Sequence, residues 1–168
     1  MNLNDTLIHK EMYQCSSQPS QSAQSASALQ PPQAITGTVC FTDAAWSQAT
    51  NRAGCGWCFM NRENVAFLQD ARAFELISSP LMAEAIAIRS ALLHALEAGI
   101  LENCIKSDCQ ALIAALSSKR HPADLYGIIG TSRLSLRFTR ISFCFISRSL
   151  NFLADSLPKS VLYSSFPN

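Results

Sequence analysis

Four carboxylates stand where the sequence leads us to expect burial or the end of a structural element: Asp43, Glu84, Asp108 and Asp155. Asp43 follows Val39 and Phe41 at strand spacing, so it shares their face of a strand. Glu84 belongs to an otherwise apolar helical row with intervals of three and four residues, formed with Leu81, Ile88, Leu92 and Ala95. A buried charge needs a partner, which makes these side chains candidates for chemistry.

Carboxylate oxygens gathered at one point are the ligands that Mg²⁺ and Mn²⁺ prefer. Two such ions can activate water on one side of a phosphodiester and stabilise the leaving oxygen on the other, so the chemistry indicated is phosphodiester hydrolysis. Each residue also has an ordinary interpretation: Asp43 in a turn, Glu84 in a first helical turn, Asp108 as a helix cap and Asp155 as a solvated helix residue. Taken together, the ordinary interpretations are less convincing than each one alone, because no Lys or Arg lies beside Asp43 or Glu84 in the sequence to neutralise the charge.

The elements that must position these residues begin with three β-rich runs and a helix. The runs Thr38–Trp46, Gly54–Met60 and Val65–Phe74 predict an antiparallel three-strand meander. The stretch Leu81–Ala98 is helical in pattern, and its expected ends are Ser78 or Ser79 as N-cap, Pro80 in the first turn and Gly99 as the stop.

Strands and helices alternate in the second half of the chain. The pattern predicts a strand at Cys104–Ser107, a helix at Cys109–Ser117 capped by Ser107 or Asp108, a helix around Leu125–Leu136, a strand at Arg140–Ser147 and a last helix capped by Asn151. Such alternation implies right-handed parallel crossovers, so the first, fourth and fifth strands should be parallel and helices should pack on the sheet. The fold class expected is α/β, and chemistry gathers outside the carboxyl ends of such strands, near Asp43 and Asp108.

The composition is that of one globular domain with a tail. The chain has 168 residues, of which 48% are hydrophobic, and a net charge of +1, which excludes a strong field for capturing phosphate over long range. We expect a Ser/Gln/Pro-rich disordered tail at 1–36, a domain at 37–165 and a short C-terminal end at 166–168. An odd number of cysteines, seven, and the lack of a signal-like N-terminus favour a cytoplasmic or nuclear protein that is not secreted. No apolar run approaches the roughly 20 residues of a membrane span, and we expect a soluble monomer.

Five short motifs occur in a characteristic order: Phe41-Thr42-Asp43-Ala44-Ala45-Trp46, Gly54-Cys55-Gly56-Trp57, Met82-Ala83-Glu84-Ala85, Lys106-Ser107-Asp108-Cys109-Gln110 and Asn151-Phe152-Leu153-Ala154-Asp155-Ser156-Leu157. Together they resemble the RNase H type 1 family, and most of all its short plant-type, reverse-transcriptase-like branch. The resemblance covers roughly Thr38 to Tyr163. It implies an RNase H-like fold, a five-stranded mixed sheet with helices packed on both faces.

The resemblance also implies an activity, a cofactor and a partner. It implies a metal-dependent endonuclease that cuts the RNA strand of an RNA–DNA hybrid, with Mg²⁺ as cofactor and Mn²⁺ as a substitute. Asp43 would bridge two ions, Glu84 and Asp108 would complete one metal site, and Asp155 the other. Three further positions are expected to contact the nucleic acid: Gln110, Arg148 and Asn151.

Some features favour a rival from another class, a catalytically weak or inactive interaction module such as a decayed retroelement fragment. Arg148 stands where many family members have a mobile His that assists proton transfer. Pro158 removes a backbone hydrogen bond to Ala154 and should kink the helix that carries Asp155. The near-neutral charge and the lack of a basic insertion predict weak binding of nucleic acid.

Other residues that could do chemistry have simpler explanations. Cys55 and Cys58 have CxxC spacing, but residues three apart on a strand point to opposite faces, so we expect two buried thiols. The histidines His94 and His121 and the tryptophans Trp46 and Trp57 are expected to have packing or surface roles.

Overall fold

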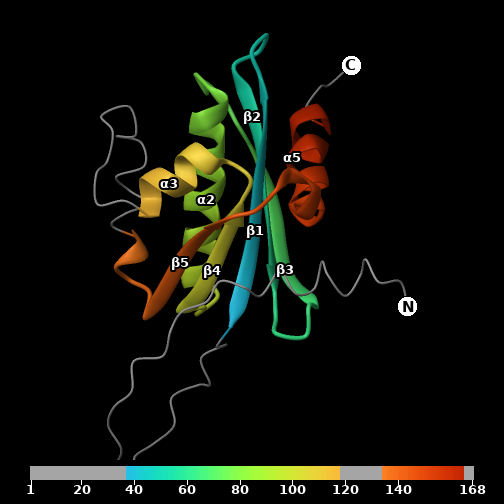
Figure 1. Ribbon diagram of the computed structural model, residues 1–168. Coiled ribbons are helices and arrows are strands. Elements are labelled where there is room, and N and C mark those ends of the chain that lie inside the picture. Colours follow the sequence, from blue (N-terminus) through green and yellow to red (C-terminus); the bar gives the residue numbers. More distant parts are fainter. Residues whose placement is uncertain (1–36, 118–133, 165–168) are drawn as a thin grey trace, which may run out of the picture.

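One mixed sheet forms the centre of the computed structural model, which describes residues 37–117 and 134–164 (Figure 1). Three strands form an antiparallel meander: β1 (Thr38–Ser47), β2 (Arg52–Met60) and β3 (Ala66–Phe74). Two more, β4 (Glu102–Ser107) and β5 (Arg140–Phe145), extend the sheet beside β1, with β4 parallel to β1 and β5 parallel to β4. The order is β3-β2-β1-β4-β5, which confirms the predicted mixed sheet and its parallel first, fourth and fifth strands.

Asparagines make the tight turns of the meander. Asn51, just before β2, has a φ of 51°, and Asn64, just before β3, has a φ of 59°, a left-handed conformation that Asn tolerates better than most residues. The side-chain oxygen of Asn61 accepts hydrogen bonds from the main-chain N–H groups of Glu63 and Val65. These turns fix a register in which Asp43 of β1 lies directly opposite Gly56 of β2.

Helix α2 (Pro80–Glu97) begins and ends as its sequence predicts. The Ser79 hydroxyl accepts a hydrogen bond from the N–H of Met82, Pro80 is the first helical residue, and Gly99 follows the helix with a φ of +73°. Helix α3 (Gln110–Ser117) starts one residue later than expected, and the Ser107 hydroxyl accepts from the N–H of Cys109 just before it. Local capping chemistry therefore sets the start of both helices.

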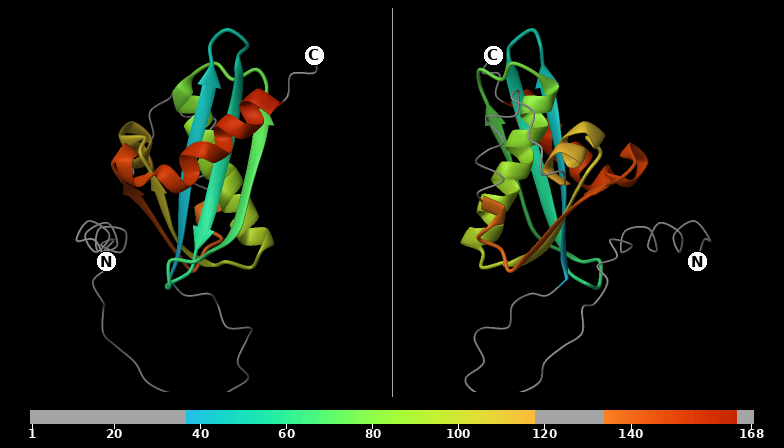
Figure 2. Two further views of the ribbon diagram at one scale, coloured as in Figure 1. Left: turned by 90° about the vertical axis from the view of Figure 1, so that its right-hand side faces the viewer. Right: turned by 60° about the vertical axis from the view of Figure 1, so that its left-hand side comes forward.

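Helices lie on both faces of the sheet, as predicted. Figure 2 shows α2 and α5 (Phe152–Ser164) on opposite sides, with α3 on the side of α2. A larger apolar cluster, which includes Trp57, Ile88 and Ile105, fills the space between the sheet and α2 and α3. A smaller cluster under α5 contains Val39, Phe41, Cys58, Met60, Ile146 and Ala154. Cys55 belongs to the larger cluster and Cys58 to the smaller, so the prediction that these two thiols face opposite ways is confirmed.

Several segment boundaries differ from the prediction by one or two residues. The last strand ends at Phe145 rather than Ser147, because Arg148–Leu150 forms a 3-10 turn that leads into α5. Helix α5 is continuous through Pro158 and ends at Ser164. The tail predicted for 1–36 and most of the helix predicted around 125–136 lie outside the described residues. Within the described ranges no helix is both long enough and apolar enough to cross a membrane.

Candidate metal centre

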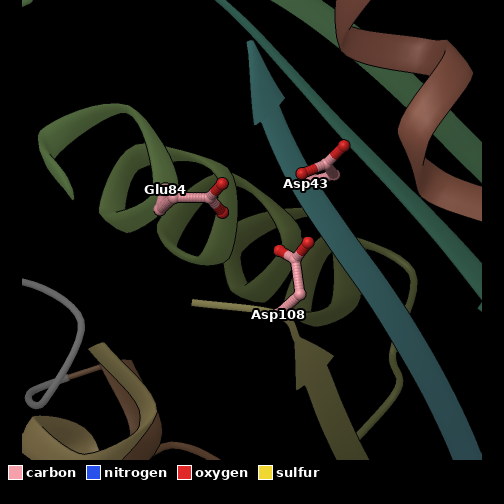
Figure 3. Close-up of side chains that lie close together, drawn as sticks. All are labelled: Asp43, Glu84 and Asp108. Atoms are coloured by element: carbon pink, nitrogen blue, oxygen red, sulfur yellow. The ribbon is translucent and has the colours of Figure 1, made fainter. Parts of the chain in front are cut away.

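Three carboxylates from three separate elements meet where the carboxyl end of β4 lies beside the middle of β1 (Figure 3). Asp43 comes from β1, Glu84 from the second turn of α2, and Asp108 from the residues between β4 and α3. One oxygen of each lies within 4.8 Å of the others. Asp43 is only 4% exposed, although an aspartate side chain that is open to water is charged at neutral pH. The prediction that these three residues form one metal-sized cluster is confirmed.

Burial and neighbouring negative charges disfavour the charged forms of two of the three carboxylates. Burial, followed by the neighbouring charge of Asp108, raises the pKa of Asp43 from 3.8 to about 6. Burial, followed by the charges of Asp43 and Asp108, raises the pKa of Glu84 from 4.5 to about 8. Hydrogen bonding from the main chain of Ala44 and the charge of Arg148 act in the opposite direction on both groups but do not balance these effects.

The donor set fits a hard divalent cation. All three side chains offer oxygen, and the buried Oε2 of Glu84 has no hydrogen-bond partner. An unpaired buried carboxylate oxygen costs free energy unless a cation or a proton satisfies it. A divalent ion would supply the missing charge to all three groups together, which is the arrangement that Mg²⁺ and Mn²⁺ accept.

The fourth predicted ligand, Asp155, lies outside this cluster of three. It stands in the first turn of α5, and its Oδ2 accepts a hydrogen bond from Lys159 Nζ, 2.6 Å away in the next turn. Its charge nevertheless contributes to the raised pKa of Asp43, so the two carboxylates are close enough to interact electrostatically. Lys159 is a residue that the sequence reasoning missed, although its spacing of four from Asp155 is visible in the sequence.

Two of the residues predicted to bind nucleic acid are exposed beside the cluster. Arg148 Nε lies 3.9 Å from Asp108 Oδ2, and the Arg148 side chain is 78% exposed. Gln110 is the first residue of α3, two positions after Asp108, and is exposed. Both side chains are therefore open to solvent near Asp108.

Asn151 has a different environment from the one expected. It is 1% exposed, and its side-chain Nδ2 donates to the main-chain oxygen of Thr42 over 2.9 Å. Asn151 immediately precedes α5, as predicted, but the N–H groups of Ala154 and Asp155 donate to its main-chain oxygen rather than to its side chain. The predicted side-chain cap is therefore replaced by a tie between α5 and β1, and the Asn151 side chain is almost fully buried.

The architecture matches that of solved RNase H structures, so the fold is RNase H-like. Crystallised RNase H1 from the archaeon Halobacterium salinarum has a TM-score of 0.71 at 19% identity, covering 76% of this chain and 98% of that one. The N-terminal RNase H domain of a Mycobacterium tuberculosis protein has a TM-score of 0.67 at 20% identity, covering 76% and 94%. LC11-RNase H1, solved in complex with an RNA/DNA hybrid, has a TM-score of 0.68 at 15% identity, covering 76% and 98%.

The sequence identifies the family within this fold. Residues 41–161 match the reverse transcriptase-like family, and the chain belongs to it. The matched range includes all three residues of the cluster as well as Asp155. No curated protein sequence matches the chain significantly.

Proposed function

We propose that this domain is a metal-dependent endonuclease that hydrolyses the RNA strand of RNA–DNA hybrids with two Mg²⁺ ions. The observation that carries the proposal is the triad of Asp43, Glu84 and Asp108: its oxygens lie close together, the pKa values of Asp43 and Glu84 are raised, and one buried oxygen of Glu84 is unpaired. A merely structural cluster would have a Lys or Arg between its carboxylates, whereas Arg148, which lies 3.9 Å from Asp108, has a side chain that is 78% exposed.

Each carboxylate has a distinct part in the proposed reaction. Bound Mg²⁺ ions would supply an activated water and would neutralise charge on the leaving oxygen. Asp43, on the central strand of the sheet, would help to hold both ions. Glu84 and Asp108 would hold one ion, and Asp155 would hold the other after release from Lys159.

Residues at the rim would select and orient the substrate. Gln110 lies at the start of α3, where it could contact the minor groove of a hybrid, whose ribose 2′-hydroxyls distinguish RNA. Arg148 could contact a backbone phosphate near Asp108 once a metal ion neutralises that carboxylate. LC11-RNase H1, which shares the fold, was solved with an RNA/DNA hybrid, and this supports the assignment of substrate class.

A direct test uses the full chain, a labelled RNA–DNA hybrid and either Mg²⁺ or Mn²⁺. Wild type should cut the RNA strand slowly and leave duplex DNA intact. Asp43→Asn should abolish cleavage, because both ions depend on that carboxylate. Asp70→Asn is the matched control, since Asp70 lies on β3 in an ion pair with Arg72 and should not matter. Equal residual cutting by wild type and Asp43→Asn would reject the nuclease.

One observation favours the rival, a non-catalytic interaction module. Asp155 is already paired with Lys159, and Asp108 lies close to Arg148, so two of the four carboxylates have a cation of the chain beside them. Such a domain would bind hybrid without turnover. It would do so equally well with and without Mg²⁺, which a gel-shift measurement in EDTA distinguishes from the nuclease.

A further inference from the structure

The side chains of β2 that face α5 increase in size along the strand. Because side chains alternate across a sheet, Gly54, Gly56, Cys58 and Met60 form one row, and the last two belong to the apolar cluster under α5. The row therefore has no side chain at one end and a long one at the other. A helix lying on it can approach the sheet closely only over the two glycines.

Helix α5 makes that close approach. A Cβ atom placed on Gly56 would lie 2.6 Å from the Cβ of Leu157 and 2.8 Å from the Cδ of Pro158. A Cβ on Gly54 would collide with the carbonyl oxygen of Pro158 and lie 2.8 Å from its carbonyl carbon. Real Cβ contacts essentially never fall below 3.0 Å, so no other residue fits at either position without moving the helix.

The contact lies level with the metal centre. Gly56 is the partner of Asp43 in the β1–β2 register, and Gly54 is the partner of Ala45. Asp155 precedes Leu157 by two residues on α5, so it projects from the helix within one turn of the contact. Any substitution that lifts α5 from β2 here would move Asp155 relative to Asp43.

We propose that Gly54 and Gly56 are positioning residues for Asp155: by leaving β2 bare opposite Asp43, they let α5 come close enough for its carboxylate to complete the second metal position. This inference rests on the proposed function. It identifies Gly54 and Gly56 as the residues that set the distance between Asp155 and the other three carboxylates.

The same contacts show how Pro158 fits between α5 and β2. The residue is buried, and its carbonyl oxygen lies where an α-hydrogen of Gly54 points, an arrangement found where backbones pack closely. Any residue at position 158 has that carbonyl group. The approach of the helix is thus set mainly by the glycines and the main chain, and the proline ring is accommodated by Gly56.

The test is a count of bound Mn²⁺ ions by electron paramagnetic resonance on the full chain. Wild type should bind two ions, and Asp155→Asn should lose the weaker one. Gly56→Ala should weaken the second ion at least ten-fold and leave the first within two-fold. Gly99→Ala is the matched control, because Gly99 has a φ of +73° but no atom within 4 Å of a new Cβ. It should lower the melting temperature and keep both ions.

Pro158→Ala provides a second arm that does not depend on the folding of Gly56→Ala. It keeps the main chain over Gly54 and the contact of Leu157, so the affinity for the second ion should stay within two-fold. A ten-fold change would overturn the inference, because the proline ring would then set the helix position. A folded Gly56→Ala that binds two ions like wild type would also overturn it. If Asp155→Asn binds ions like wild type, the proposed fourth ligand itself is wrong, and this positioning role is rejected with it.

Discussion

The side-chain nitrogen of Asn151 and the main-chain oxygen of Thr42 form a buried hydrogen bond of 2.9 Å. It joins two residues that are 109 positions apart in the sequence. Each of them lies close in the chain to one of the candidate metal-binding carboxylates. Thr42 immediately precedes Asp43, and Asn151 immediately precedes α5, which carries Asp155. The bond therefore holds the first turn of α5 against the central strand.

Removing this bond should destabilise the domain. We expect Asn151→Ala to lower the free energy of unfolding by about 1–3 kcal/mol, because the oxygen of Thr42 loses a buried donor. Urea denaturation measures the change. Ser149→Ala is the control, since Ser149 is exposed and its hydroxyl bonds only to the nearby Ser147. A loss for Asn151→Ala no larger than that for Ser149→Ala would show that the tie contributes nothing.

The metal-free protein should become less stable as the pH rises. The pKa of Glu84 is raised from 4.5 to about 8 and that of Asp43 from 3.8 to about 6, so the folded state holds more protons than the unfolded state between these values. The stability that these protons provide is fully present below about pH 4 and is lost progressively up to about pH 8. Thermal melts in EDTA across this range should show the decline.

Metal and mutation should each reduce this loss of stability at high pH. Mg²⁺ should raise the melting temperature more at pH 8 than at pH 5, because it binds only the deprotonated carboxylates. Glu84→Gln should make the metal-free protein more stable at pH 8 by on the order of 2 kcal/mol, since a neutral amide replaces a charge that is costly to bury. A Glu84→Gln protein with the same decline between pH 5 and 8 as wild type would contradict this account.

Lys159 should compete with a cation for Asp155. We expect Lys159→Gln to bind its weaker Mn²⁺ about two- to five-fold more tightly, which matches the small free energy of an exposed ion pair. Isothermal titration calorimetry gives the two affinities. Arg72→Gln removes the same charge from the Asp70 ion pair on β3 and serves as the control. Equal gains in both variants would mean that only net charge matters.

Arg148→His should increase turnover if proton transfer limits the reaction. Arg148 lies beside Asp108, and an imidazole there could exchange a proton near neutral pH, which a guanidinium does not. We expect kcat to rise about ten-fold and to acquire a pH dependence centred near 6.5. Arg148→Gln should show neither effect. A rise in both variants would instead indicate that removal of the Arg charge relieves the metal site.

The sheet and the three clustered carboxylates were predictable because their signals are local or topological. Ser79, Pro80 and Gly99 fix the ends of α2 by capping chemistry that is visible in the sequence. The parallel crossover then places β4, which ends just before Asp108, beside β1, which carries Asp43, and the helical row places Glu84 on the face toward the sheet.

The remaining features depend on contacts between distant segments. Asn151 was predicted as a helix cap, because nothing near it in the sequence reveals Thr42 as the partner of its side chain. Pro158 looked like a disruption of α5, because the space above Gly54 and Gly56 exists only after β2 and α5 pack. The 3-10 turn that shortens the last strand likewise follows an alternating pattern that continues past Phe145.

Both tryptophans of the chain form hydrogen bonds to α2 or to the residues just before it. Trp57 is fully buried, and its indole N–H donates to Nδ1 of His94 on α2 over 2.8 Å. The indole of Trp46 donates to the main-chain oxygen of Ile77, just before α2. Intrinsic fluorescence is therefore a reporter of the docking of α2. Detachment of α5, which lies across the sheet, would leave both indoles in place and needs a separate optical label on that helix.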